Sequence, residues 1–236
     1  MIFLTGDTHG EFQHVVDFCH KMKTTVDDIV VILGDVGLNY YGGRRDRAQK
    51  ELLDSLQTTF FCIHGNHENR PGNISSYHIK EWHGGKVYVE DAHPNLLFAK
   101  DGEVYNLNKL QTIVIGGAYS VDKYRRLHNH WSWWPDEQPS EEIKAKVEKT
   151  LEACGWKIDI VLSHTTPLKY EPVEAFLPMI DQSTVDRSTE NWLDMIEDRL
   201  DYLHWYCGNF HIEKNIDDLT IMFQSFREFP GSDTFT

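Results

Sequence analysis

Short apolar runs alternate with amphipathic stretches along most of the chain, a pattern that predicts alternating strands and helices. Mostly apolar runs, typical of strands buried on both faces of a sheet, occupy residues 2–4, 29–33, 60–63, 87–89, 96–99, 112–115, 158–162, 205–207 and 219–223. Apolar residues recur at helical spacing over residues 12–22, 44–56, 140–153 and 189–204. The pattern therefore predicts an α/β fold.

Two segments show no clear periodicity. Residues 120–139, SVDKYRRLHNHWSWWPDEQP, follow a predicted strand, and residues 168–188 follow His164. We expect the second segment to form a wall of a cleft or an interface. The chain of 236 residues shows no repeats or convincing linkers, and this length suits one large domain. We predict a single domain over residues 1–236, with an irregular insert at about 120–139 near the functional cleft.

Polar residues gather where the predicted strands end. Five apolar runs are each followed by a turn that carries Asp, Asn or His, namely Asp7 and His9, Asp35, Asn66 and His67, His164, and His211. Open α/β sheets bind ligands beyond the carboxyl ends of their strands, so we expect these groups to meet at one edge. Asp7 and His9 lie two residues apart, and an extended segment would turn both to the same side.

Each of these turns alone has an ordinary explanation. A single His after a strand is more often a surface or capping residue than a metal ligand, and Gly-Asp is common in turns. The joint pattern is harder to explain in this way. A mixed set of Asp, Asn and His suits a pair of divalent transition metals, with Mn, Fe and Zn as candidates. The set contains no Cys, which argues against a structural zinc site.

The blocks GDTHG, GDVG, HGNHE, SH and GNFH occur in this order between residues 6 and 211. In order and combination they resemble the five blocks of the calcineurin-like metallophosphoesterase superfamily. The resemblance implies a metallophosphoesterase-type β-sandwich of two mixed sheets flanked by helices, in four layers αββα. It also implies a dinuclear centre at the strand ends, with the first metal held by Asp7, His9, Asp35 and His211, and the second by Asp35, Asn66, His164 and Asn209.

The implied reaction is hydrolysis of a phosphomonoester or phosphodiester of a small molecule or nucleotide. Two metals clamp the phosphoryl group and activate a bridging hydroxide, and Asp35 would bridge them through its two oxygens. We expect Mn, with Fe or Zn as alternatives. His67 would not be a ligand, but would protonate the departing oxygen or hydrogen-bond to it. We expect Glu68 to support the site or to start a helix, and not to act as a catalyst.

Departures from the family pattern narrow the substrate. Protein serine/threonine phosphatases carry GDxVDRG and RGNHE, but here Leu38 and Asn39 replace the Asp and Arg of the first motif, and His64 replaces the Arg of the second. The arginines that grip phosphate and the Asp that orients the catalytic His are therefore missing from these positions. A phosphoprotein substrate is disfavoured.

The irregular segment 120–139 offers a replacement for the missing grip. Its basic residues are Lys123, Arg125, Arg126, His128 and His130, and they are interleaved with Trp131, Trp133 and Trp134. Basic groups beside aromatic plates can hold a phosphate and stack a base. The alternative is that the tryptophans seal the sheet and the basic groups are solvated.

Asn209 stands where the family block has a metal-binding His. It is either a bystander, a relic that binds no metal, or a weaker ligand. We favour the weaker ligand because His211 lies two residues on, and an extended segment would place both side chains on one face. An amide oxygen is neutral and a poorer donor than imidazole toward Zn or Fe, so we expect the second metal to bind more weakly.

The composition of the chain excludes some classes of binding partner. The net charge of -14 opposes capture of an extended nucleic acid or an anionic membrane, and no apolar run approaches the roughly 20 residues of a membrane helix. Four scattered cysteines and an N-terminus unlike a signal peptide favour the cytoplasm. The expected partner is a phosphoester substrate, and no oligomeric state is favoured.

Two alternatives to a small-molecule phosphoesterase remain. One is a nuclease that acts on single strands or ends, and the other is a catalytically weakened metal-binding scaffold. The retained His67 argues against the scaffold.

Overall fold

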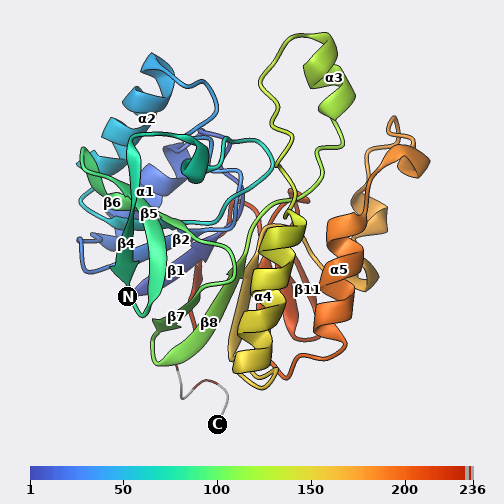
Figure 1. Ribbon diagram of the computed structural model, residues 1–236. Coiled ribbons are helices and arrows are strands. Elements are labelled where there is room, and N and C mark those ends of the chain that lie inside the picture. The colour runs from blue at the N-terminus through green and yellow to red at the C-terminus, as the bar shows by residue number, and fades with distance from the viewer. Residues whose placement is uncertain (232–233, 235–236) are drawn as a thin grey trace.

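Two mixed β-sheets pack face to face, and helices cover their outer faces (Figure 1). The computed structural model describes residues 1–231 and 234. The first sheet has the order β13 (Arg227–Glu228), β1 (Ile2–Thr5), β2 (Ile29–Ile32), β3 (Thr59–Cys62), β6 (His93–Ala99), β5 (Gly85–Glu90) and β4 (Tyr77–Trp82). The second has the order β11 (Lys214–Ile216), β12 (Leu219–Ile221), β10 (His204–Cys207), β9 (Ile160–Ser163), β8 (Leu110–Ile115) and β7 (Val104–Leu107). The predicted four-layer fold is confirmed.

The centre of each sheet is parallel, and this positions the functional residues. Strands β1, β2, β3 and β6 run parallel, and so do β8, β9, β10 and β12. The outer strands β13, β5, β4, β11 and β7 pair antiparallel. Parallel neighbours end at the same edge, so the turns after β1, β2 and β3 lie side by side.

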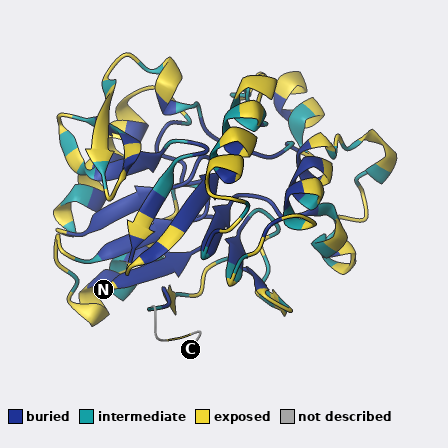
Figure 2. Ribbon diagram, turned by 60° about the horizontal axis from the view of Figure 1, so that its bottom comes forward, coloured by how far each residue is buried: buried dark blue, intermediate teal, exposed yellow. Residues whose placement is uncertain are grey.

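Strand β2 shows why its run of residues is wholly apolar. Successive side chains of a strand point to opposite faces. Ile29 and Val31 therefore enter the core between the two sheets, while Val30 and Ile32 pack against the outer helices. All four are buried, so a polar residue at any of them would lose contact with water. Figure 2 shows the same pattern across both sheets, with buried strands beneath helices whose outer faces are exposed.

Helices α1 (Gln13–Met22) and α2 (Arg44–Ser55) pack on the first sheet, and α4 (Glu141–Ala153) and α5 (Ser188–Glu197) on the second. Ser140 caps α4 as the sequence predicts, since its side chain accepts a hydrogen bond from the backbone N–H of Ile143. The short helix α3 (Lys123–His128) protrudes from the body of the molecule (Figure 1). Among the described residues, no helix is long and apolar enough to cross a bilayer.

The structure corrects several predicted elements. The last helix ends at Glu197, before the predicted end at 204, because β10 begins at His204. Strand β4 was not predicted, since most of its residues are exposed and it has no buried apolar run. The segment 120–139 is not wholly irregular, because it contains α3. Residues 168–188 contain only short 3-10 turns ahead of α5.

Leu162→Ala should lower the free energy of unfolding by about 2–5 kcal/mol, the usual range for a buried Leu. Leu162 is completely buried in β9 within the core between the sheets. Chemical denaturation followed by circular dichroism measures the change. Leu52→Ala is the matched control, because Leu52 is 43 % exposed and should shift stability by less than about 0.5 kcal/mol. Equal losses would contradict the assignment of the core.

Candidate active site

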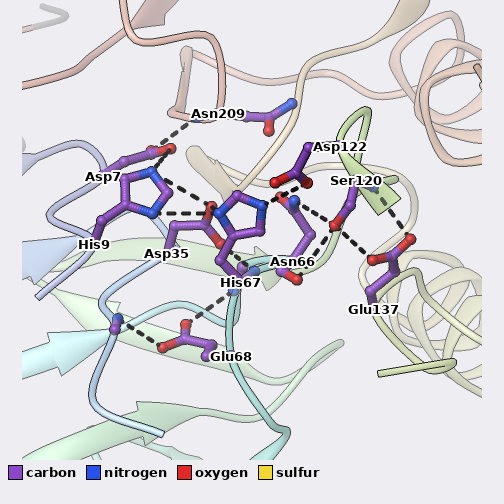
Figure 3. Close-up of polar contacts among 12 residues, drawn as sticks. Asp7, His9, Asp35, Asn66, His67, Glu68, Ser120, Asp122, Glu137 and Asn209 are labelled. Atoms are coloured by element: carbon purple, nitrogen blue, oxygen red, sulfur yellow. Dashed lines mark hydrogen bonds and ion pairs between the residues drawn. The ribbon is translucent and has the colours of Figure 1, made fainter. Parts of the chain in front are cut away.

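The turns after β1, β2, β3, β9 and β10 bring the predicted polar residues to one place. They contribute Asp7 and His9, Asp35, Asn66 and His67, His164, and Asn209 and His211 respectively. Figure 3 shows several of these side chains converging on Asp35. Groups of ligand atoms that could hold a metal ion occur within this set, including Asp7 with His9 and His211, and Asp7 with Asp35 and His164.

Asp7, His9 and His211 form the first group. The Nε2 atoms of His9 and His211 face each other at 2.9 Å. The Oδ2 atom of Asp7 lies 3.2 Å from the His211 Nε2 and 3.8 Å from the His9 Nε2. This Oδ2 is buried and accepts no hydrogen bond from the described residues. A buried carboxylate oxygen without a donor is costly, and a divalent cation at this point would satisfy it.

Asn66 and His164 form the second group. His164 Nδ1–H donates to the carbonyl of Leu33 at 2.8 Å, which leaves the Nε2 of neutral His164 with a lone pair. Asn66 Nδ2 donates to Ser120 Oγ at 2.9 Å, so its Oδ1 faces the His164 Nε2 at 2.8 Å. Two acceptors then face each other in a buried site. A bound cation would turn this repulsion into coordination, so the residues fit a metal.

Asp35 lies between the two groups and turns one oxygen to each. Its Oδ2 is 3.8 Å from His9 Nε2, and its Oδ1 is 3.5 Å from His164 Nε2. The Oδ1 also accepts the backbone N–H of His67 at 2.8 Å. Burial would raise the pKa of Asp35, but His67, His164 and His9 outweigh it and lower the pKa well below its usual range. Asp35 is therefore a charged group at the centre of the site.

Four of the candidate ligands have left-handed backbone conformations. The φ angles are 48° at His9, 47° at Asp35, 68° at Asn209 and 53° at His211. Asp, Asn and His tolerate this region better than most residues, and such strain is concentrated at functional sites. The turns are therefore not extended, and the prediction that placed His9 beside Asp7, and Asn209 beside His211, on one face of an extended segment is wrong. Asp7 and His9 still converge, through the tight turn.

Asn209 touches Asp7 through its backbone. Its N–H donates to Asp7 Oδ1 at 2.9 Å, and its side-chain Nδ2 donates to Thr165 Oγ1 at 3.2 Å. Within residues 1–231 and 234 no hydrogen bond reaches its Oδ1. The left-handed conformation gives a second reason for Asn at this position, because Asn adopts it more readily than most residues. Whether the Oδ1 binds a metal stays a prediction.

His67 faces Asp35 with one ring nitrogen and Asp122 with the other. Its Nδ1 lies 3.4 Å from Asp35 Oδ2, and its Nε2 donates to Asp122 Oδ1 at 3.2 Å. Burial lowers the pKa of His67, but Asp35 and then Asp122 outweigh it, so the pKa is raised. Asp122 was missed in the sequence, where nothing distinguishes it from the many other acidic residues.

The family model for calcineurin-like phosphoesterases matches residues 1–179, which include six of the eight candidate residues above. The chain belongs to the calcineurin-like phosphoesterase family. No curated protein matches. Among solved structures, TT1561 of Thermus thermophilus is similar to this chain, with 13% sequence identity and a TM-score of 0.49. The match covers 94% of this chain and 87% of the TT1561 chain. The phosphopantetheinyl hydrolase PptH of Mycobacterium tuberculosis is 15% identical with a TM-score of 0.45 over the same shares. At these TM-scores neither carries an argument about substrate.

Glu68 connects two turns of the site. It is fully buried, and its carboxylate accepts the backbone N–H groups of Gly37 at 3.2 Å and Gly65 at 3.1 Å. Burial, then the charge of Asp35, raises the pKa of Glu68 to about 8. Gly65 has a matching constraint, because a Cβ there would lie 2.0 Å from Asp35 Oδ1. The turns after β2 and β3 therefore pack closely enough to fix Asp35.

The segment 120–139 contacts the site through Ser120 and Glu137, which lie on the side of Asn66 away from Asp35 (Figure 3). Ser120 Oγ donates to Glu137 Oε2 at 2.6 Å, so Ser120 presents an acceptor to Asn66. Arg126 is 1% exposed and donates to Ser120 Oγ at 2.9 Å and to the carbonyl of Ser132 at 2.8 Å. These nitrogens of Arg126 therefore bind the protein's own atoms, while its Nη2 is buried without a hydrogen-bond partner among the described residues and the side chain lines the same cavity as His9. Ser120 and Glu137 carried no signal in the sequence.

The other basic residues of the segment remain closer to solvent. Lys123 lies over the Trp133 ring at 4.3 Å, and Arg125 lies over the Trp131 ring at 5.5 Å. Arg125 lines a cavity that also reaches Asp35, and His130 lines a cavity that reaches His9. His128 is exposed and lines neither cavity. Of the five predicted substrate contacts, Arg125, Arg126 and His130 line cavities that adjoin the site, whereas Lys123 and His128 do not.

Two cavities meet at His67 and Asp122. The tyrosine cavity, of about 560 Å³, is lined by residues that include His9, Tyr40, Tyr41 and Trp131. The phenylalanine cavity, of about 580 Å³, reaches Asp35 and Asn66 and includes Phe176 and Phe210. A third cavity of about 950 Å³ adjoins Tyr40 and Tyr41 but contains none of the candidate ligands. A ligand bound beside His67 could therefore extend into open space on either side of this residue.

Proposed function

We propose that this protein is a metal-dependent phosphoesterase that hydrolyses a phosphomonoester or phosphodiester of a small molecule or nucleotide. The observation that carries the proposal is Asp35, which turns one oxygen to each of two groups of candidate ligands while His67 stands beside it. Membership of a phosphoesterase family supports it.

Two divalent ions would be held by the residues that face Asp35. Asp7, His9, Asp35 and His211 would hold the first, and Asp35, Asn66, His164 and Asn209 the second. When bound, such ions neutralise phosphoryl charge and lower the pKa of water. We propose Mn as the native metal, because the set mixes carboxylate and amide oxygens with imidazoles. We also propose a reducing compartment, the cytoplasm, in which the four free cysteines would stay reduced.

His67 is the proposed general acid, and Asp122 is its positioning residue. The Nδ1 of His67 faces the metal-binding groups, so this nitrogen would donate a proton to the departing oxygen. The Nε2–H is held by Asp122, which is itself 3.9 Å from the buried Arg126. Asp122 thus supplies the carboxylate that the altered GDVGLNY block lacks, from a different part of the chain.

Asp35→Asn should abolish most phosphoesterase activity and release at least one metal. The amide keeps the shape and can still accept the His67 N–H, but it cannot bridge two cations as a carboxylate does. Elemental analysis and the rate with p-nitrophenyl phosphate and added Mn measure both effects. Asp91→Asn is the control, because the Asp91 side chain is 97% exposed. Survival of both metal content and rate would contradict the dinuclear site.

His67→Ala should keep both metals and lower kcat by about 10²- to 10⁴-fold, the usual contribution of general acid–base catalysis. The loss should be smaller for nitrophenyl than for alkyl leaving groups, since a good leaving group needs little protonation.

Asp122→Asn should lower kcat roughly 10- to 100-fold, which corresponds to the free energy of a charge-assisted hydrogen bond. This loss should depend on the leaving group in the same way.

The double variant decides how these two residues are related. If Asp122 acts through His67, His67→Ala with Asp122→Asn should be no slower than His67→Ala alone. Additive losses, or an equal Asp122→Asn loss for both leaving groups, would show that Asp122 serves the fold and not His67. Metal content of each variant controls for collapse of the site.

Asn209→Gly should weaken the second metal by about 10-fold or more, on the scale of altered metal shells. Glycine keeps the left-handed turn, so only the amide is lost. Asn209→His should tighten the same metal. Calorimetric titration with Mn measures both, and Asn108→Gly is the control because Asn108 has a φ of 50° outside the site. Unchanged titrations for both Asn209 variants would make Asn209 a bystander.

A further inference from the structure

The space around His67 is divided into two compartments of different chemistry. Of the residues that the structure describes, only His67 and Asp122 line both the tyrosine cavity and the phenylalanine cavity. A phosphorus atom bound beside His67 would therefore have open space on two sides. A phosphomonoester has one organic substituent and would occupy one cavity, whereas a phosphodiester has two.

The phenylalanine cavity combines an apolar set of residues with charged ones, among them Arg125, Glu171 and Arg187. Its apolar lining includes Val121, Phe176, Leu177, Ile180, Phe210 and Ile212. The rings of Phe176 and Phe210 lie nearly parallel with centroids 6.5 Å apart, and Leu177 remains 55% exposed. Solvent-exposed apolar residues gathered at a concave site are typical of ligand-binding grooves. The wall that bears Phe176 and Leu177 belongs to the segment 168–188.

The tyrosine cavity offers flat rings instead. Tyr40 and Tyr41 pack edge to face with centroids 4.8 Å apart, and Trp131, from the segment 120–139, also lines the cavity. Tyr41 and Trp131 are 48% and 49% exposed. Exposed aromatic faces bind planar groups by stacking, so this cavity suits a planar ring better than an alkyl chain.

We infer that the substrate is a phosphodiester with one apolar organic group and one planar group, each in its own cavity. This inference rests on the proposed function. The apolar group occupies the phenylalanine cavity against Phe176 and Leu177. The planar group occupies the tyrosine cavity against Tyr41 and departs with its oxygen, because an aryl oxygen is a better leaving group than an alkyl oxygen and His67 also lines that cavity. Water adds to phosphorus and releases one proton to solvent, the P–O bond to the planar group breaks, and the leaving oxygen takes a proton from His67, which regains one from solvent.

Alkyl p-nitrophenyl phosphates test this directly, with the alkyl group varied from methyl to hexyl below any micelle concentration. The leaving group is the same throughout, so kcat/KM reports the alkyl group alone. We expect kcat/KM to rise roughly two- to fourfold per methylene, as burial of a CH₂ group in an apolar site predicts. The hexyl value should exceed that of p-nitrophenyl phosphate, the monoester with the same leaving group.

Leu177 and Met179 provide a matched pair of variants. Leu177→Ser should flatten the dependence on chain length, because Leu177 lines the cavity. Met179→Ser should leave it unchanged, because Met179 is 85% exposed in the same segment and is not part of the cavity. Both side chains face solvent, so neither variant should unfold the protein. Tyr41→Ala should lower kcat/KM by one common factor at every chain length.

The outcomes separate this inference from the function on which it rests. Release of p-nitrophenol from no ester, with Mn present, would overturn the proposed function. Hydrolysis of p-nitrophenyl phosphate with no preference for longer diesters would leave the phosphoesterase intact and overturn the two-cavity substrate. A chain-length dependence that Met179→Ser flattens as much as Leu177→Ser would also overturn it.

Discussion

The charge of Asp35, enclosed by three imidazoles, organises the rest of this structure. A carboxylate that is completely buried loses its hydration and must be compensated by opposite charge or by donors. His9, His67 and His164 surround it, and the backbone N–H of His67 donates to it. These residues come from three different turns. The relative positions of these turns must therefore be fixed. The parallel strands that precede the turns, and the close contact of Gly65 with Asp35, fix them.

The convergence of the polar turns could be predicted because it depends on patterns that a sequence displays. A continuous apolar run indicates a buried parallel strand, and parallel strands end together, so Asp35 and Asn66 had to be neighbours once β2 and β3 paired. The four-layer architecture followed from the family resemblance. The ligand roles of these residues stay predictions, since convergence alone does not measure metal binding.

The other features of the site could not be predicted, because they depend on contacts between distant segments that leave no pattern in the sequence around each residue. Asp122 acts on His67 across 55 positions of chain, and one Asp in a polar segment looks like any other. Arg126 was predicted as a substrate contact from basic residues beside tryptophans, and nothing in the sequence indicated that it would be buried beside the rings of Tyr40 and Trp134. Positive φ angles at His9 and Asn209 are equally invisible, since they result from tight turns imposed by the surrounding sheets.

The separation of the ligands along the chain has a consequence for biosynthesis. His9 and His211 face each other across 202 positions, and β1 is completed at its edge by β13. A nascent chain that has emerged through β6 carries Asp7, His9, Asp35 and Asn66, but has neither His164 nor His211. Contacts of such high sequence separation are slow to form, because a long loop must be closed first. The set of candidate ligands can close only when both sheets are made and docked, so an incomplete chain has only part of the site.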